Sequence, residues 1–501
     1  MYRGFRVVAI SAIITTASLL IHADGQLGSE SAEIQLRLGQ LLFEQGQYPE
    51  SLDAYRNALR SEDPFSVRTA RAGVIQSALR VAEFDLARRE AETLVKASPR
   101  NPEALALYGD SLWSAGLFDQ AEAKYRDALS AAPELARGRH GLARSLLART
   151  RLDDAMNEAQ AALRLAPRDL EIHHTVGAIY ERMHKFEEAA VAYGNYVNLL
   201  PNKDRSDKAE WARAEIRFLR SFGKRTPFDM DQAPENTLYS VDFKLVKEKV
   251  VVRARVNGSS PQDFVVDTGA ENTVITRPTL DRLNITPITY TLSAGVGDIG
   301  LRGLQLARLD SLEFGALKVR NVPVLVKSPP LRDIPSRETE SLSPLALGFS
   351  MTVDYKAHKL TFGKHLPDEP RDFELPLRLY RLATVGGIVG GNHVNFVVDT
   401  GGEVISISQA TASAMPKSDV RHIPLKVWGT SGWEKDAFLL PGVDLSFDRI
   451  QYKNFPVVVL NLNAPSVLLG FQLGGIVGTQ FLKNYRVVID LEHSVLRLKG
   501  V

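Results

Sequence analysis

The spacing of apolar residues divides the chain into two parts. From about residue 30 to residue 222, apolar residues recur every three to four positions in stretches separated by polar turns, as in LGQLLFEQGQYPESLDAYRNAL (38–59). This period predicts pairs of amphipathic helices. From Leu238 onward the pattern changes to short β-rich runs such as KVVVRARV (249–256) and RNVPVLV (320–326). These runs predict many short strands and few helices.

The helical part repeats with an almost constant period. Each unit opens with a small residue and closes with a proline, and successive positions of each kind lie 34 to 36 residues apart. The opening residues are Gly39, Gly73, Gly109, Ala143 and Gly177, and the closing residues are Pro64, Pro99, Pro133, Pro167 and Pro201. A small residue lets two helices approach closely, and a proline stops the second helix before the next unit begins.

This pattern closely resembles the tetratricopeptide repeat. The resemblance implies an α-solenoid over residues 30–222, with about five repeats and a capping helix. It also implies a groove for peptide segments, lined by the inner helices, or a docking surface for a protein partner. By register, the residues expected near this groove are Trp113, Arg137, His140, Arg144 and His174. That these side chains are only solvated is an equally good interpretation, and a solenoid alone names no activity.

The β-rich part contains the same motif twice. Residues 223–237 hold two prolines and no apolar period, which predicts a linker. Beyond it, FVVDTG occurs at 264–269 and again at 396–401, and glycines follow each aspartate at the same two spacings. Residues 238–364 and 375–501 are therefore predicted to be two copies of one β-lobe.

Each copy of the motif places a carboxylate at the end of an apolar strand, at Asp267 and Asp399. Burying such a group is costly unless the group is paired or used. Two carboxyl groups about 3 Å apart cannot both ionise, so they share one proton. The ionised partner can then activate a water, while the protonated partner donates to a scissile carbonyl. Two related lobes can bring two such acids face to face.

A DTG sequence after an apolar strand, present twice, resembles the aspartic proteases, and the short lobes resemble their retropepsin-like branch fused in tandem. The resemblance implies a two-lobed all-β barrel fold in which Asp267 and Asp399 form the catalytic dyad. The residues expected to support the active-site loops are Thr268, Gly269, Thr400 and Gly401. Two glycine-containing turns, 293–303 and 427–436, are implied to be flaps over an extended peptide. Their glycines are Gly295, Gly297, Gly300, Gly429 and Gly432.

Some positions depart from the family pattern. The second lobe has the family's hydrophobic-hydrophobic-Gly element at Ile476-Val477-Gly478, but the nearest match in the first lobe is Leu347-Gly348. Gly402 stands where the family prefers Ala, Ser or Thr. These departures keep a second function open, that of a non-catalytic peptide-binding or scaffold protein with a degenerate protease fold.

Composition narrows the possible partners, cofactors and catalytic groups of the protein. The 501 residues are 44% hydrophobic and 24% charged, as in a multidomain globular protein, and the formal charge of +2 gives no reason to expect nucleic acid as a partner. The absence of cysteine excludes disulfides, thiolate metal sites and a cysteine nucleophile. The ten histidines show no metal-ligand spacing, so neither a metal nor a cofactor is expected. The expected partner is a peptide or protein substrate.

The N-terminal segment has the pattern of a secretory signal. Arg3 and Arg6 precede an apolar run at residues 7–21, and Ile21-His22-Ala23 fits a cleavage site. Cleavage after residue 23 would export the protein to the periplasm or the exterior, without stable membrane insertion. The run is short for a bilayer span, but if the segment were retained it would anchor the protein in a membrane.

Overall fold

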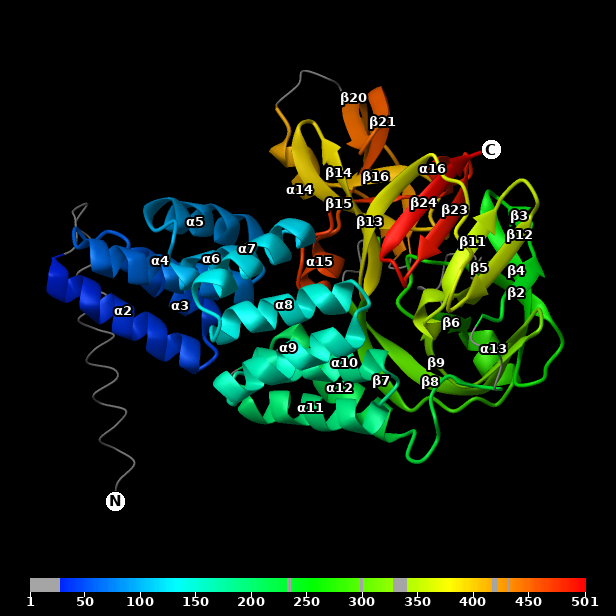
Figure 1. Ribbon diagram of the computed structural model, residues 1–501, viewed down its shortest axis with the longest axis horizontal. Coiled ribbons are helices and arrows are strands. Elements are labelled where there is room, and N and C mark those ends of the chain that lie inside the picture. The colour runs from blue at the N-terminus through cyan, green and yellow to red at the C-terminus, as the bar shows by residue number, and fades with distance from the viewer. Residues whose placement is uncertain are drawn as a thin grey trace.

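The computed structural model describes residues 28–202, 204–231, 234, 236–297, 301–327, 340–416, 422–429 and 432–501. The predicted signal segment 1–23 and Gly300 lie outside these residues. An array of helices occupies the N-terminal part of the chain, and a mostly β region follows it, which confirms the predicted fold class (Figure 1). Within the described ranges, no helix is both long and apolar enough to cross a membrane.

The helices form successive antiparallel pairs. The pairs are α2 (Ser29–Glu44) with α3 (Tyr48–Ala58), α4 (Pro64–Arg80) with α5 (Phe84–Ala97), α6 (Pro102–Ser114) with α7 (Phe118–Ala131), α8 (Ala136–Ala148) with α9 (Leu152–Leu165), and α10 (Leu170–Arg182) with α11 (Phe186–Leu199). α12 (Asp207–Arg220) follows the last pair. The small residues lie where the helices touch, since a Cβ on Gly109 would meet the Tyr125 ring at 2.5 Å and one on Gly177 would meet the Tyr193 ring at 2.6 Å.

The array curls until its first repeats contact the segment that follows the fifth repeat. The hydroxyl group of Tyr48 donates to an Asp204 carboxylate oxygen at 3.0 Å. Arg80 donates to the same carboxylate and to Glu171, at 2.5 Å in both cases. Asp204 is 2% exposed, so these ion pairs join the two ends of the array in a nearly dry contact.

The two lobes have the same strand order. In lobe 1 the order is β9 (Leu317–Lys327), β6 (Thr273–Thr276), β10 (Glu340–Leu342), β5 (Gln262–Val266), β4 (Lys249–Val256) and β8 (Leu301–Phe314), and β7 (Thr289–Ala294) lies beyond β8. In lobe 2 the order is β21 (Ile450–Leu460), β16 (Ile405–Ser408), β22 (Gly475–Val477), β15 (Asn392–Val398), β14 (Leu382–Val389) and β20 (Phe438–Phe447). The β region therefore contains two groups of strands with one common order.

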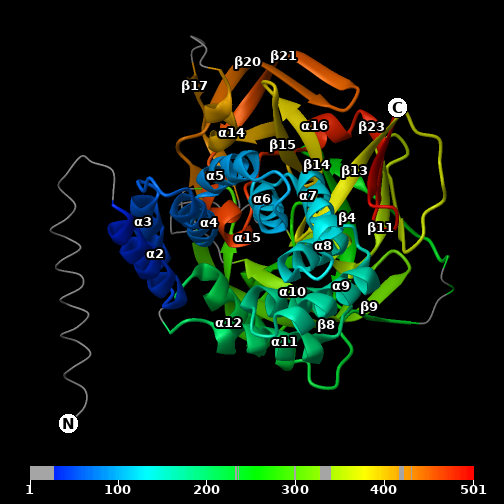
Figure 2. The same cartoon turned by 60° about the vertical axis from the view of Figure 1, so that its left-hand side comes forward.

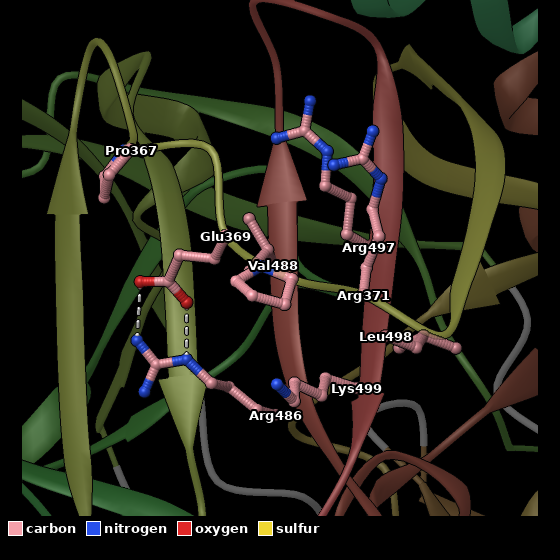
Figure 3. A pocket seen from close by; sticks show the side chains of 9 residues that line it. Pro367, Glu369, Arg371, Arg486, Val488, Arg497, Leu498 and Lys499 are labelled. Carbon is pink, nitrogen blue, oxygen red and sulfur yellow. Dashed lines mark hydrogen bonds and ion pairs between the residues drawn. The ribbon is translucent and has the colours of Figure 1, made fainter.

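A third group of strands comes from both halves of the β region and continues the sheet of lobe 2, while the lobe 1 strands above form a separate sheet. Its order is β13 (Phe373–Tyr380), β24 (Val495–Gly500), β23 (Tyr485–Asp490), β11 (Ser350–Asp354), β12 (Lys359–Gly363) and β2 (Tyr239–Asp242). All of the pairings between neighbours in this group are antiparallel. The chain between β12 and β13 is fastened by Glu369, which accepts bonds of 2.7 and 2.9 Å from Arg486 (Figure 3). The pocket beside this ion pair holds about 10 Å³, room for a single water at most.

The predicted linker over 223–237 includes a short strand that pairs with lobe 1. β1 (Asp229–Met230) pairs with β9 of lobe 1, and Arg320 of that strand donates to Asp229 at 2.8 Å. Phe222 and Phe228 are buried. The segment therefore packs against lobe 1, where Phe228 within it and Phe222 just before it supply buried apolar surface.

Two hydrophobic cores are shared between the array and the lobes. Phe218 and Phe222, at the end of α12, belong to the same cluster as Phe264 of lobe 1. Trp113 and Phe118 belong to a cluster with Phe471 of lobe 2. In Figure 2, α15 (Asn463–Leu469), just before Phe471, lies in the curve formed by α4, α6, α8 and α10. Array and lobes therefore fold against one another and are not tethered modules.

Candidate active site

Each predicted catalytic aspartate follows the central strand of its lobe. Asp267 follows β5, and its backbone N–H donates to the carbonyl of Leu342 in β10 at 2.9 Å. Asp399 follows β15, and its N–H donates to the carbonyl of Val477 in β22 at 3.0 Å. β5 and β15 each pair antiparallel on one side and parallel on the other. The same local topology therefore delivers both acids to the boundary between the lobes.

Two threonines cross that boundary. The hydroxyl of Thr268 donates to the carbonyl of Val398, and the hydroxyl of Thr400 donates to the carbonyl of Val266, both at 2.6 Å. Each hydroxyl also accepts the backbone N–H of the other threonine, at 3.1 and 3.2 Å. Both side chains are almost fully buried. The four bonds form a symmetric clamp that holds the two aspartate loops together, the support role predicted from the sequence.

Two glycines bring each loop against the opposite carboxyl group. The N–H of Gly269 donates to Asp267 at 3.0 Å, and the N–H of Gly401 donates to Asp399 at 2.8 Å. A Cβ on Gly269 would meet Cγ of Asp399 at 2.6 Å, and a Cβ on Gly401 would meet Cγ of Asp267 at 2.8 Å. Any side chain at these positions would push the two acids apart.

The two carboxyl groups hydrogen-bond to each other and titrate as a pair. Burial raises the pKa of Asp267 to about 7, and the negative charge of Asp399 adds to the rise. Burial also raises the pKa of Asp399, but the N–H groups of Gly401 and Gly402 and the charge of Lys249 oppose this rise. Both pKa values are raised, so the pair holds one shared proton, and its two apparent pKa values belong to the pair and not to either residue.

The departure at Gly402 has a local cause. A Cβ there would meet Oδ2 of Asp399 at 2.7 Å, whereas Ala270 occupies the matching position in lobe 1. Lobe 2 therefore requires glycine where the family prefers a larger residue.

The nearest sequence match in lobe 1, Leu347-Gly348, does not occupy the place of the hydrophobic-hydrophobic-Gly element. The strand that pairs with β5 is β10, in which Leu342 takes the place that Val477 has in β22. Ser343 then stands where lobe 2 has Gly478, and its hydroxyl donates to the carbonyl of Ala270 at 2.8 Å. The element is present in lobe 1, but without its glycine, so a search for that glycine finds Gly348 instead.

The two predicted flaps meet at their tips. Gly295 and Gly297 follow β7 of the β7–β8 hairpin, while Gly429 and Gly432 are paired across the hairpin of β18 (Val427–Gly429) and β19 (Gly432–Glu434). A Cβ on Gly429 would meet the carbonyl oxygen of Val296 at 2.1 Å. Closure of these hairpins over a peptide stays a prediction.

The five predicted groove residues all contact other parts of the protein. Trp113 is 2% exposed, and its ring lies 5.0 Å from that of Tyr380 in lobe 2, so the expectation that it faces an open groove is wrong. Arg137 and Arg144 donate to Asp110 at 2.7 and 2.5 Å. His140 bonds Thr175 at 2.8 Å, and His174 packs against Tyr193 and Tyr196. The Arg137 side chain is 32% exposed, which is more than Arg144 or His140.

Sequence reasoning missed three charged residues around the dyad. Lys249 lowers the pKa of both aspartates through its positive charge. Arg381 donates from Nε to Glu271 at 2.7 Å, and Glu271 lies in the loop that begins with Asp267. Lys249 and Arg381 occupy equivalent places in the two halves, 18 residues before their aspartates. Comparing charged positions between the halves would have found them.

Two family models match the chain. An aspartyl protease model matches residues 252–364 and 385–481, and a tetratricopeptide repeat model matches residues 20–68 and 75–136. No curated protein matches the chain.

Several solved repeat proteins are similar to the helical part. A thermophilic TPR protein of Thermus thermophilus is 21% identical over 38% of this chain and 98% of that chain, with a TM-score of 0.32. The PilF protein of Pseudomonas aeruginosa is 20% identical over 38% of this chain and 86% of that chain, with a TM-score of 0.27. YrrB, described as a TPR protein with an unusual peptide-binding site, is 18% identical over 35% of this chain and 89% of that chain, with a TM-score of 0.23.

The threonine clamp is open to a direct test. Thr400→Val keeps the side-chain shape but removes the donor to Val266 and the acceptor for the Thr268 N–H. We expect it to lower the free energy of unfolding by about 1–3 kcal/mol, because buried backbone groups lose their partners. Denaturant unfolding measures the change, and Thr400→Ser, which retains the hydroxyl, is the control. Equal stability of the valine and serine variants would contradict the clamp.

Proposed function

Since this chain joins tetratricopeptide repeats to an aspartyl protease domain, we propose that it is an aspartic-type endopeptidase that is exported from the cell. One observation carries the proposal: Asp267 and Asp399 are hydrogen-bonded to each other, half-buried, and held by a symmetric clamp. Such a pair keeps one acid protonated and the other ionised in the same small space, as metal-free amide hydrolysis requires.

The proposed mechanism starts with the shared proton assigned to Asp267 and the negative charge assigned to Asp399. Asp399 takes a proton from a water held between the carboxyl groups, and the water oxygen attacks the scissile carbonyl carbon. Asp267 gives its proton to the carbonyl oxygen, which produces a neutral tetrahedral diol. Asp399 then passes its proton to the amide nitrogen, the C–N bond breaks, and Asp267 recovers a proton from a diol hydroxyl. The pair ends in its starting protonation state.

The flaps and the array complete the proposal. The β7–β8 and β18–β19 hairpins would close over an extended peptide and exclude water, which strengthens every electrostatic interaction in the site. The array would recruit the protein substrate or a partner, a role supported by the interactions typical of its repeat type. Export is supported by the pattern of residues 1–23, and N-terminal sequencing of the mature protein tests it.

Isosteric replacement of either acid tests the dyad. We expect Asp267→Asn and Asp399→Asn each to lower kcat on an unfolded protein substrate by at least about a thousandfold, because neither acid works alone. The matched control is Asp263→Asn, in the strand β5 that precedes Asp267, because Asp263 is exposed and paired with Arg253. Peptide binding without cleavage by the native chain would favour the alternative of a non-catalytic scaffold.

The pH dependence of kcat/KM tests the shared proton. The active form carries one proton on the pair, so the rate should fall when Asp267 ionises, near pH 7, and again at low pH when Asp399 is protonated. Because the pKa of Asp399 is also raised, we expect a bell-shaped profile with its maximum at about pH 5 to 6. A maximum below about pH 3, under the ordinary pKa of an aspartate, would contradict this assignment.

Recruitment by the array predicts an effect that depends on substrate size. Arg137→Ala on α8 should raise KM for a whole protein substrate by about threefold or more and leave KM for a short peptide unchanged, since only the larger substrate reaches the array. Arg139→Ala is the matched control, because Arg139 is on the same helix but pairs with Glu158 of α9. Equal KM changes for both substrates would contradict recruitment.

A further inference from the structure

The turn of the β13–β14 hairpin contacts all three parts of the protein. Its turn residue, Arg381, has a φ of +62° although it is not glycine. A side chain in this backbone region costs about 1–2 kcal/mol and persists only where the surroundings hold it. The contacts of the Arg381 side chain therefore explain why the turn keeps a positive φ.

The guanidinium group of Arg381 joins a repeat helix to both lobes. Nε donates to Glu271 of lobe 1 at 2.7 Å, and Nη1 donates to the carbonyl of Leu468 in lobe 2 at 3.0 Å. The same group lies 5.3 Å from the ring of Trp211 in α12. The Arg381 and Glu271 side chains are only 24% and 30% exposed, so solvent screens the ion pair less than it would at the surface.

The residues beside Arg381 are also held by the array. Arg182 of α10 donates to the carbonyl of Leu379 at 3.1 Å, and the ring of Trp113 meets that of Tyr380 at 84°. In Figures 1 and 2, β13 runs beside α8 of the array. Two helices and the capping helix thus grip three consecutive residues of this turn.

Glu271 connects the contacts of Arg381 to the loop that carries Asp267. It lies four residues after Asp267, in the loop whose Thr268 forms half of the clamp and whose Ala270 carbonyl is bonded by Ser343. A fixed Glu271 therefore limits the movement of the segment that carries the protonated acid.

The other lobe lacks this grip. Lys249 stands where Arg381 would be in lobe 1, and Glu403 stands where Glu271 would be in lobe 2. Glu403 is exposed, and Lys249 acts on the charge of both aspartates. Contact of Trp211 with the Arg381–Glu271 pair is therefore one difference between the two halves.

We infer that Trp211 of the repeat array is a positioning residue for catalysis, acting through Arg381 and Glu271 on the loop that carries Asp267. The array is then part of the catalytic unit in addition to any recruiting role. The kinetic consequence rests on the proposed function, whereas the physical consequence, restraint of residues 268–271, does not.

Kinetics of full-length variants on a short peptide test the inference. Trp211→Leu and Arg381→Met should each lower kcat about tenfold with KM changed less than about twofold, because small misplacement of a reacting group slows chemistry more than binding. The double variant should be no slower than Arg381→Met, and Trp211→Phe should restore most of the rate. Arg449→Met, which removes a similar contact with the Phe373 ring at 5.5 Å, is the control and should change nothing. An unchanged kcat in Trp211→Leu, or losses that multiply in the double variant, would overturn the inference.

Hydrogen exchange gives a second readout that needs no activity. In the Asp267→Asn background, Trp211→Leu and Arg381→Met should each speed amide exchange at residues 268–271 at least about fivefold, while Arg449→Met should not. Unchanged exchange would overturn the inference even in a chain that hydrolyses nothing. If the native chain hydrolyses no peptide, the proposed function is refuted. Hydrogen exchange then still decides whether Trp211 and Arg381 restrain residues 268–271.

Discussion

The structure depends on holding two carboxyl groups in contact inside a protein. Desolvation and mutual repulsion both oppose such a pair, so it persists only by sharing a proton and by being held from both sides. The crossed bonds of Thr268 and Thr400 supply the hold, and the glycines after them supply the space. A duplicated lobe is the simplest way to provide the same loop twice, face to face.

The array changes how the duplicated lobes work. Its aromatic residues complete the hydrophobic cores of both lobes, and lobe 2 occupies part of its inner face through Tyr380 and Phe471. A helical repeat array in this arrangement contacts both lobes, and a substrate bound to it would lie beside the β region that carries the dyad. Positioning and recruitment are therefore compatible roles for one array.

Local sequence patterns predicted much of this architecture. Contacts between residues far apart in the chain could not be predicted from such patterns. Helix pairs follow from the period of small residues and prolines, and the site follows from FVVDTG at 264 and 396, because both signals are local. The lobe 1 counterpart of β22 could not be located from the sequence, because Ser343 stands where the motif has a glycine. Trp113 does lie on a helix of the array, but the lobe-2 residues that cover it come more than 260 positions later in the chain. No local pattern records such a contact.

The shared proton is the central claim, and carboxyl ¹³C NMR of the aspartate-labelled full-length chain tests it most directly. The account predicts two coupled titrations for Asp267 and Asp399, with the later one near pH 7, and it predicts that Asp267→Asn removes that step and leaves a single titration on Asp399. Two independent titrations near the ordinary aspartate value of about 4 would contradict it, since separated, solvated carboxyl groups would then stand where the account places a proton-sharing pair.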